Sequence, residues 1–147
     1  MMVFEFEYYI KNNLVKKKSV DRSEANALMR KAGERLEFSI KTRKINEKTA
    51  SFIFEDIYEC LREASQSLMS LKGYKPYSHE ALIAFLKNLN LLESDIEMFD
   101  KYRILRNKAV YGGERISVEK CNEALRFLIS FLPELKKEFE VLRDKNV

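Results

Sequence analysis

The stretch that decides the fold runs from Ala50 to Leu71 and reads ASFIFEDIYECLREASQSLMSL. Its apolar residues recur at steps of three and four, which places them on one face of an α-helix. These positions are Ala50, Ile53, Phe54, Ile57, Leu61, Ala64, Leu68 and Leu71. Gly73 and then Pro76 follow, as is typical after a helix C-terminus. The sequence therefore predicts a long helix over this stretch.

Two helices are predicted before it. Residues Phe6–Leu14 carry apolar side chains at helical spacing, and the basic run Lys16–Lys18 follows. Asp21 and Glu24 have the spacing of a capping box, with Asp in place of the usual Ser or Thr. The helical period then continues over Ala25–Ile40, which predicts a second helix there.

Two further helices are predicted after it. Ser78 is a candidate N-cap for a short helix containing Ala81–Leu89. Ser94 with Glu97 forms another capping box, which predicts the start of a fifth helix. That helix is expected to end at Gly112–Gly113.

A last helix is expected from a Ser117 cap, with apolar positions between Val118 and Leu132. Pro133 either kinks this helix or starts a separate segment over Leu135–Leu142. Convincing period-two alternation is confined to the first few residues. The fold class is therefore all-α, an up-and-down bundle of about five to six helices, because short connections place successive helices antiparallel.

Composition agrees with this class. The 147 residues fit one domain, and the apolar share of 46% with 34% charged residues excludes global disorder. Cys60 and Cys121 lack metal-ligand spacing and there is one histidine, so no metal site and no cofactor are predicted. No apolar run reaches the roughly 20 residues of a membrane span, and the N-terminus does not resemble a signal peptide. We expect a cytoplasmic protein without a membrane partner.

Charge is unevenly distributed along the chain. Residues 1–48 carry 12 basic and 7 acidic side chains, residues 49–100 carry 4 and 9, and residues 101–147 carry 11 and 7. Two interpretations stay open. The basic ends form a face that attracts nucleic acid or an acidic partner, or solvated helix faces simply differ in sign.

The predicted fifth helix carries an unusual polar group. Residues four apart on a helix are offset by only about 40°, so Arg103, Asn107 and Tyr111 form one row with Arg106 beside it. Guanidinium groups match phosphate oxygens, Asn hydrogen-bonds a ribose or base, and Tyr stacks on a base. The alternative is structural: these side chains pair with carboxylates of the same helix within Asp95–Asp100.

The segment Arg106–Gly113, Arg-Asn-Lys-Ala-Val-Tyr-Gly-Gly, resembles the signature of the HEPN domain, the higher-eukaryote and prokaryote nucleotide-binding family. The segments Ala25–Ala32, Phe52–Leu71 and Tyr77–Leu82 are similar to earlier helices of the family. The resemblance covers residues 22–132 of a single domain. Residues 1–20 are then a short N-terminal helix and basic segment, and residues 133–147 a helical C-terminal extension.

The resemblance implies an up-and-down bundle that forms a homodimer. Many family members are metal-independent RNases with an R-x4–6-H motif, and others pair with a minimal nucleotidyltransferase as a toxin–antitoxin module of prokaryotes. Arg106 matches the motif Arg and Asn107 the polar residue after it, whereas Tyr111 stands where the His would fall. A Tyr is a poor general base near neutrality, so this departure favours binding without cleavage.

Three functional hypotheses follow. The leading one is a dimeric HEPN-type module that binds nucleotide or RNA, with or without a nucleotidyltransferase partner. The second is a metal-independent endoribonuclease, and the third a helical protein-interaction subunit without a nucleic-acid role. The candidate catalytic residues are Arg106, Asn107 and Tyr111. The candidate nucleotide- or RNA-binding residues are Arg103, Arg106, Asn107, Lys108, Tyr111 and His79.

Overall fold

Residues 3–145 are described in a computed structural model, and most of them are helical. Six α-helices, one π-helical turn and two short strands make up this range. In chain order they are α1 (Phe6–Lys11), β1 (Val15–Lys17), α2 (Arg22–Glu34), η1 (Arg35–Ile40), α3 (Ala50–Leu71), β2 (Tyr74–Pro76), α4 (His79–Leu86), α5 (Glu93–Gly112) and α6 (Val118–Lys145). The all-α prediction is confirmed.

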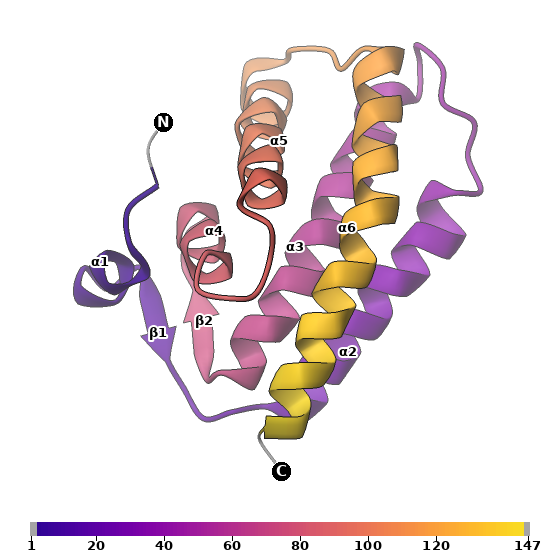
Figure 1. The fold of residues 1–147 in the computed structure, drawn as a ribbon. Coiled ribbons are helices and arrows are strands. Elements are labelled where there is room, and N and C mark those ends of the chain that lie inside the picture. The colour runs from indigo at the N-terminus through magenta and orange to yellow at the C-terminus, as the bar shows by residue number, and fades with distance from the viewer. Residues whose placement is uncertain (1–2, 146–147) are drawn as a thin grey trace.

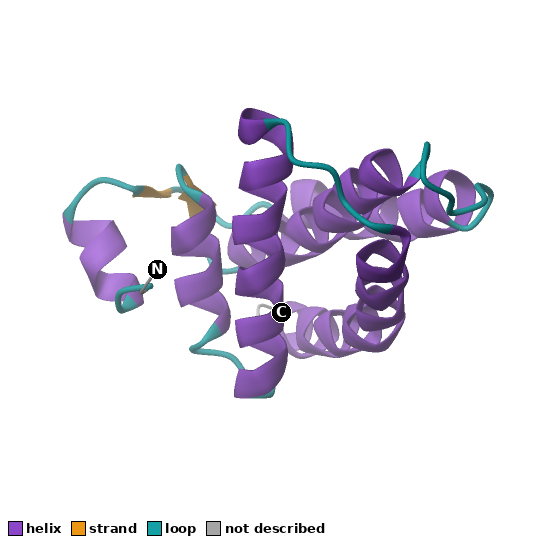
Figure 2. Ribbon diagram, turned by 90° about the horizontal axis from the view of Figure 1, so that it is seen from above, coloured by secondary structure: helices purple, strands orange, loops and turns teal. Residues whose placement is uncertain are grey.

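The helix α3 organises the molecule. It packs along α2 and α6, and also contacts α4 and α5. Helices α2, α3, α5 and α6 alternate in direction (Figure 1), which is the up-and-down arrangement expected from the sequence. Viewed from above, α1, α4 and α5 lie on one side of the molecule and the other helices on the opposite side (Figure 2). The predicted apolar face of α3 is buried throughout.

A two-stranded antiparallel ribbon joins the N-terminal segment to the rest. Val15 pairs with Pro76, and Lys17 pairs with Tyr74. Gly73, at φ 79°, turns the chain from α3 into β2, and a Cβ there would lie 2.6 Å from the carbonyl oxygen of Lys18. The sequence did not predict these strands, because three residues are too few to show a period of two.

The predicted N-caps are confirmed at three of four helices. The side chains of Asp21 and Ser78 accept hydrogen bonds from backbone amides three residues on, at 2.9 and 3.1 Å. Ser117 does the same at the start of α6, at 3.0 Å. The Ser94 cap is wrong, because α5 begins one residue earlier, at Glu93, behind an extended Leu92 with no side-chain cap.

Two other boundaries differ from the prediction. The first helix ends at Lys11 instead of Leu14, since Asn13 adopts a left-handed conformation and the chain continues into β1. At the other end, α6 runs without interruption through Pro133, which is exposed. An exposed proline position lets water replace the hydrogen bond that the ring removes, so the predicted separate segment is part of α6.

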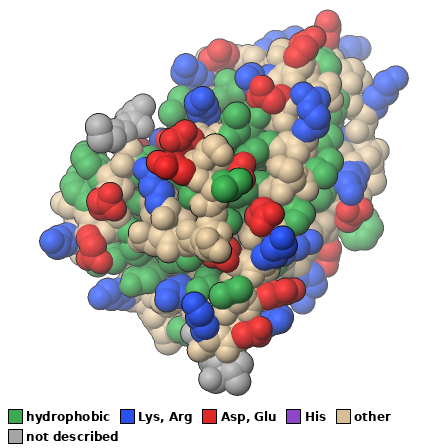
Figure 3. All heavy atoms as spheres, viewed as in Figure 1, with side chains coloured by type: hydrophobic (Ala, Val, Ile, Leu, Met, Phe, Trp, Pro, Cys, Tyr) green, Lys and Arg blue, Asp and Glu red, His purple; other side chains and the backbone are tan. Residues whose placement is uncertain are grey.

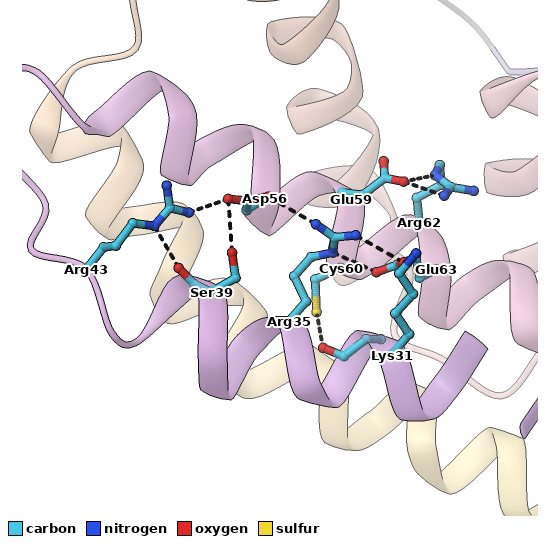
Figure 4. A network of polar contacts seen from close by, with 10 residues as sticks. Lys31, Arg35, Ser39, Arg43, Asp56, Glu59, Cys60, Arg62 and Glu63 are labelled. Carbon is cyan, nitrogen blue, oxygen red and sulfur yellow. Dashed lines mark hydrogen bonds and ion pairs between the residues drawn. The ribbon is translucent and has the colours of Figure 1, made fainter. Parts of the chain in front are cut away.

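An ion-pair network connects η1 to α3 (Figure 4). The Arg35 guanidinium donates to Glu63 at 2.8 Å and to Asp56 at 3.1 Å. Lys31 lies 3.6 Å from the same Glu63, which is buried. Arg43 completes the network by pairing with Asp56. Residues 49–100 carry more acidic than basic side chains, and these contacts account for part of that excess. Carboxylates of this segment pair with basic side chains of residues 1–48.

Basic and acidic side chains are interspersed over the face shown in Figure 3. On this face the charge segregation along the sequence gives no extended patch of one sign. None of the helices within residues 3–145 combines the length and apolar character needed to cross a membrane.

Candidate functional site

The site forms where α3, α4 and α5 meet. Tyr58 of α3 lies beside His79 of α4, with ring centroids 5.6 Å apart and ring planes only 6° from parallel. The Arg106 guanidinium, from α5, lies 5.6 Å from the Tyr58 ring centroid and 5.7 Å from that of Tyr111. Arg106 also donates to the side-chain oxygen of Asn107 at 3.4 Å. We call Tyr58, His79, Arg106, Asn107 and Tyr111 the Tyr58 cluster.

The hydroxyl of Tyr58 holds His79 in place. It lies 2.6 Å from Nδ1 of His79, and burial raises the pKa of Tyr58, so the hydroxyl stays protonated. The hydroxyl has no other partner among residues 3–145, so it donates to Nδ1, which places the imidazole proton on Nε2. Burial lowers the pKa of His79, and the nearby guanidiniums of Arg106 and Arg62 lower it further. His79 is therefore neutral near pH 7, with an N–H at its outer nitrogen.

The helix position of Arg106 leaves its guanidinium accessible. The side chain is partly buried against Tyr58 and makes no ion pair with any carboxylate of residues 3–145. Asn107 is also partly buried, and the Tyr111 ring is 78% exposed. Lys108 is exposed and lies outside these contacts, so it adds charge without a fixed geometry. The structure thus brings four of the predicted residues together: His79, Arg106, Asn107 and Tyr111.

Arg103 has a different environment from the one expected. Only 2% of it is exposed, and it pairs with Asp100 at 2.6 Å and with Glu80 at 3.5 Å. The structural alternative is therefore the correct one for this residue, which does not reach the surface of the Tyr58 cluster. Its Nη2 atom is buried without a hydrogen-bond partner within the described range. The Arg103 charge still acts on the cluster, since it partly opposes the rise that burial causes in the pKa of Tyr58 and adds to the fall that burial causes in the pKa of His79.

Sequence reasoning missed three residues of α3 that belong here. Tyr58, Arg62 and Gln66 occupy steps of four and so form one row on the helix. Arg62 donates to Glu59 at 3.0 Å and also to the side-chain oxygen of Gln66. The apolar period of α3 is so regular that it masks this polar row. The four-residue spacing of three polar side chains was the signal that could have revealed it.

A cavity of about 150 Å³ adjoins the cluster. Arg62 and Gln66 line one side, and Tyr77, His79 and Leu82 line the other. The cavity shares His79 with the cluster, so hydrogen-bond donors and the exposed ring of Tyr77 adjoin it. This combination suits a ligand that carries both a phosphate and a flat ring.

Among residues 3–145, no group of three or more His, Cys, Asp or Glu side chains is arranged to hold a metal ion. No protein-family model, curated protein or solved structure matches the chain in comparisons with known proteins.

Proposed function

We propose that the protein binds RNA or a nucleotide through the Tyr58 cluster. The observation that carries the proposal is the partly exposed Arg106 guanidinium, held between the rings of Tyr58 and Tyr111 without a carboxylate partner in residues 3–145. A guanidinium held in this way loses little conformational entropy when it forms a bidentate contact with a phosphate. The exposed Tyr111 ring stands beside it as a surface on which a base can stack.

The resemblance of Arg106–Gly113 to the HEPN signature supports the same proposal. In this proposal the protein acts in the cytoplasm as a HEPN-type homodimer, in which two Tyr58 clusters line a shared cleft. A minimal nucleotidyltransferase is the proposed partner protein, as in a toxin–antitoxin module. The mass of the free protein in solution by light scattering tests the dimer independently of RNA.

Salt-dependent RNA binding tests the main proposal. Fluorescence anisotropy with a mixed-sequence single-stranded RNA should show binding that weakens steeply with added salt, because phosphate contacts release counterions. Arg106→Ala should weaken binding about tenfold or more, whereas Arg30→Ala, at an exposed arginine of α2, should not. If the two variants lose the same amount of RNA affinity, the loss reflects net charge alone and the proposed site is wrong.

Endoribonuclease activity is the second candidate function, and the contact between His79 and Tyr58 beneath Arg106 favours it. In such a reaction the ribose 2′-oxygen attacks the adjacent phosphorus and its proton passes to solvent water, which also returns a proton to the leaving 5′-oxygen, while the Nε2–H of His79 donates a hydrogen bond. The 5′-oxygen leaves with a proton, which gives a 2′,3′-cyclic phosphate and a 5′-hydroxyl. Arg106 would stabilise the charge that develops on the phosphoryl oxygens.

Cleavage assays in EDTA separate the two functions. If wild type cleaves RNA and Arg106→Ala and His79→Gln do not, although both stay folded, the protein is an RNase. If wild type binds RNA without cleaving it and Tyr111→His gains activity, the protein is a binding module that lacks only the motif base. Absence of both binding and cleavage would leave the third hypothesis, a protein-interaction subunit.

A further inference from the structure

The cavity beside the Tyr58 cluster is lined in part by three polar side chains whose hydrogen bonds decide which of their groups stay free. The side-chain carbonyl oxygen of Gln66 accepts a hydrogen bond from Arg62. The amide NH2 group of Gln66 is therefore left free to donate. Ser78 accepts from the backbone of Ala81 at 3.1 Å, so its O–H group remains a donor. Nδ1 of His79 accepts a hydrogen bond from the Tyr58 hydroxyl, so the ring hydrogen of His79 is on Nε2. Each of these side chains therefore keeps a free hydrogen-bond donor.

The charge at the cavity is largely compensated. Arg62 is held by Glu59 of the same helix turn, through a contact at 3.0 Å and a second, shorter one (Figure 4). The remaining walls include the aliphatic side chain of Leu82 and the ring of Tyr77, which is 57% exposed. A neutralised arginine beside the aliphatic side chain of Leu82 is a poorer site for a second phosphate than for a flat, neutral ring with acceptor atoms.

We propose that this cavity holds a keto nucleobase, uracil or guanine, of the RNA whose phosphate Arg106 binds. The inference rests on the proposed function and adds base selectivity to it. Carbonyl oxygens of a keto base accept hydrogen bonds from Gln66 and His79, while Tyr77 provides a stacking surface. Cytosine and adenine would direct an exocyclic amino group at the N–H groups of Gln66 and His79, which cannot accept a hydrogen bond, and this costs binding free energy.

Oligouridylate and oligocytidylate of equal length test this inference, because they carry the same charge and differ in the groups at the base edge. Wild type should bind oligouridylate about tenfold more tightly, as expected for one well-placed hydrogen-bonded contact. Gln66→Glu replaces the free NH2 with an acceptor and should abolish or reverse this preference. Tyr77→Ala should weaken binding of both oligonucleotides without changing their ratio.

The Arg106→Ala variant separates this inference from the proposed function. It should weaken the binding of both oligonucleotides by the same factor. If wild type binds the two with equal affinity while Arg106→Ala weakens both, the base-selective cavity is wrong and the proposed function stands. If wild type binds neither, both are wrong. Circular dichroism establishes that Gln66→Glu is folded, and Gln66→Ala, which removes the donor without adding charge, should also lose the preference.

Discussion

Two arginines three residues apart on α5 show how position decides the role of a side chain. Arg103 is buried and compensated by Asp100 and Glu80, whereas Arg106 lies at the surface against two aromatic rings. Burial of an unpaired guanidinium is costly, so the carboxylates next to Arg103 are needed for the fold. Arg106 needs no such partner because water reaches it, and this leaves its donors for a ligand.

The lowered pKa of His79 predicts a pH dependence of stability. The unfolded chain takes up a proton as the pH falls through about 6.5, whereas folded His79 takes it up only at lower pH. Between these two values the unfolded state binds more protons, so the free energy of unfolding decreases as the pH falls. One proton limits this slope to about 1.4 kcal/mol per pH unit.

Urea denaturation of wild type and His79→Gln at pH 7.5 and 5.5 measures the effect. Wild type should lose more stability than the variant between these pH values, since carboxylate titration is common to both. The same pH dependence in the two proteins would mean that His79 titrates normally and that its environment is different from the one described.

The residues of the site differ in how far the sequence could predict them. Arg106, Asn107 and Tyr111 follow from one helix, because helix geometry fixes which side chains share a face. The approach of His79 to Arg106 could not be predicted, since it depends on how α4 packs against α3 and α5. The burial of Arg103 depends on the same packing, because one of its carboxylates, Glu80, comes from α4.

At the scale of elements, the helices were predicted well and their ends less so. The period of α3 held over 22 residues, because a continuous apolar face can be buried only as a helix against other helices. The strands β1 and β2 were missed, since neither has a local signal and each forms only by pairing with the other. The Ser94 cap failed because α5 begins at Glu93, which places Ser94 inside the first turn instead of at the N-cap.

The ion pairs between η1 and α3 predict a large effect of Arg35. Removing its side chain by Arg35→Ala leaves the buried Glu63 carboxylate with Lys31 alone, at 3.6 Å. We expect the free energy of unfolding to fall by about 3 kcal/mol, because the buried carboxylate loses both short contacts to Arg35 and keeps only the longer one to Lys31.

A double variant identifies the cause of this loss. Arg35→Ala combined with Glu63→Gln should be more stable than Arg35→Ala alone in urea denaturation, since the carboxylate charge is then gone. If the two changes are simply additive, the loss comes from packing of the Arg35 side chain and the ion pair contributes little.

At the scale of the whole molecule, the packing around α3 divides the protein into two sides. Helices α2 and α6 cover α3 along much of its length, with the ion-pair network on the α2 side. The Tyr58 cluster lies where α4 and α5 meet α3. A change in the ion-pair network should therefore alter stability while leaving the ligand-binding side chains intact.

The two cysteines report on the integrity of the whole bundle. Cys60 and Cys121 are fully buried, and burial raises the pKa of their thiols to about 12 and about 11. Both should react with a disulfide reagent such as DTNB only very slowly at pH 8, and rapidly in concentrated urea, because the thiolate is the reactive form. Fast modification of either thiol in the native protein would show that the helices around α3 open readily.

The most direct test of the central claim uses the single histidine as a reporter of the Tyr58 cluster. The imidazole resonances of His79 are followed by NMR while single-stranded RNA is added to wild type and to Arg106→Ala. RNA should shift these resonances in wild type and leave them largely unchanged in Arg106→Ala. RNA that binds wild type without affecting His79 would contradict the proposed site, because binding would then take place elsewhere on the molecule.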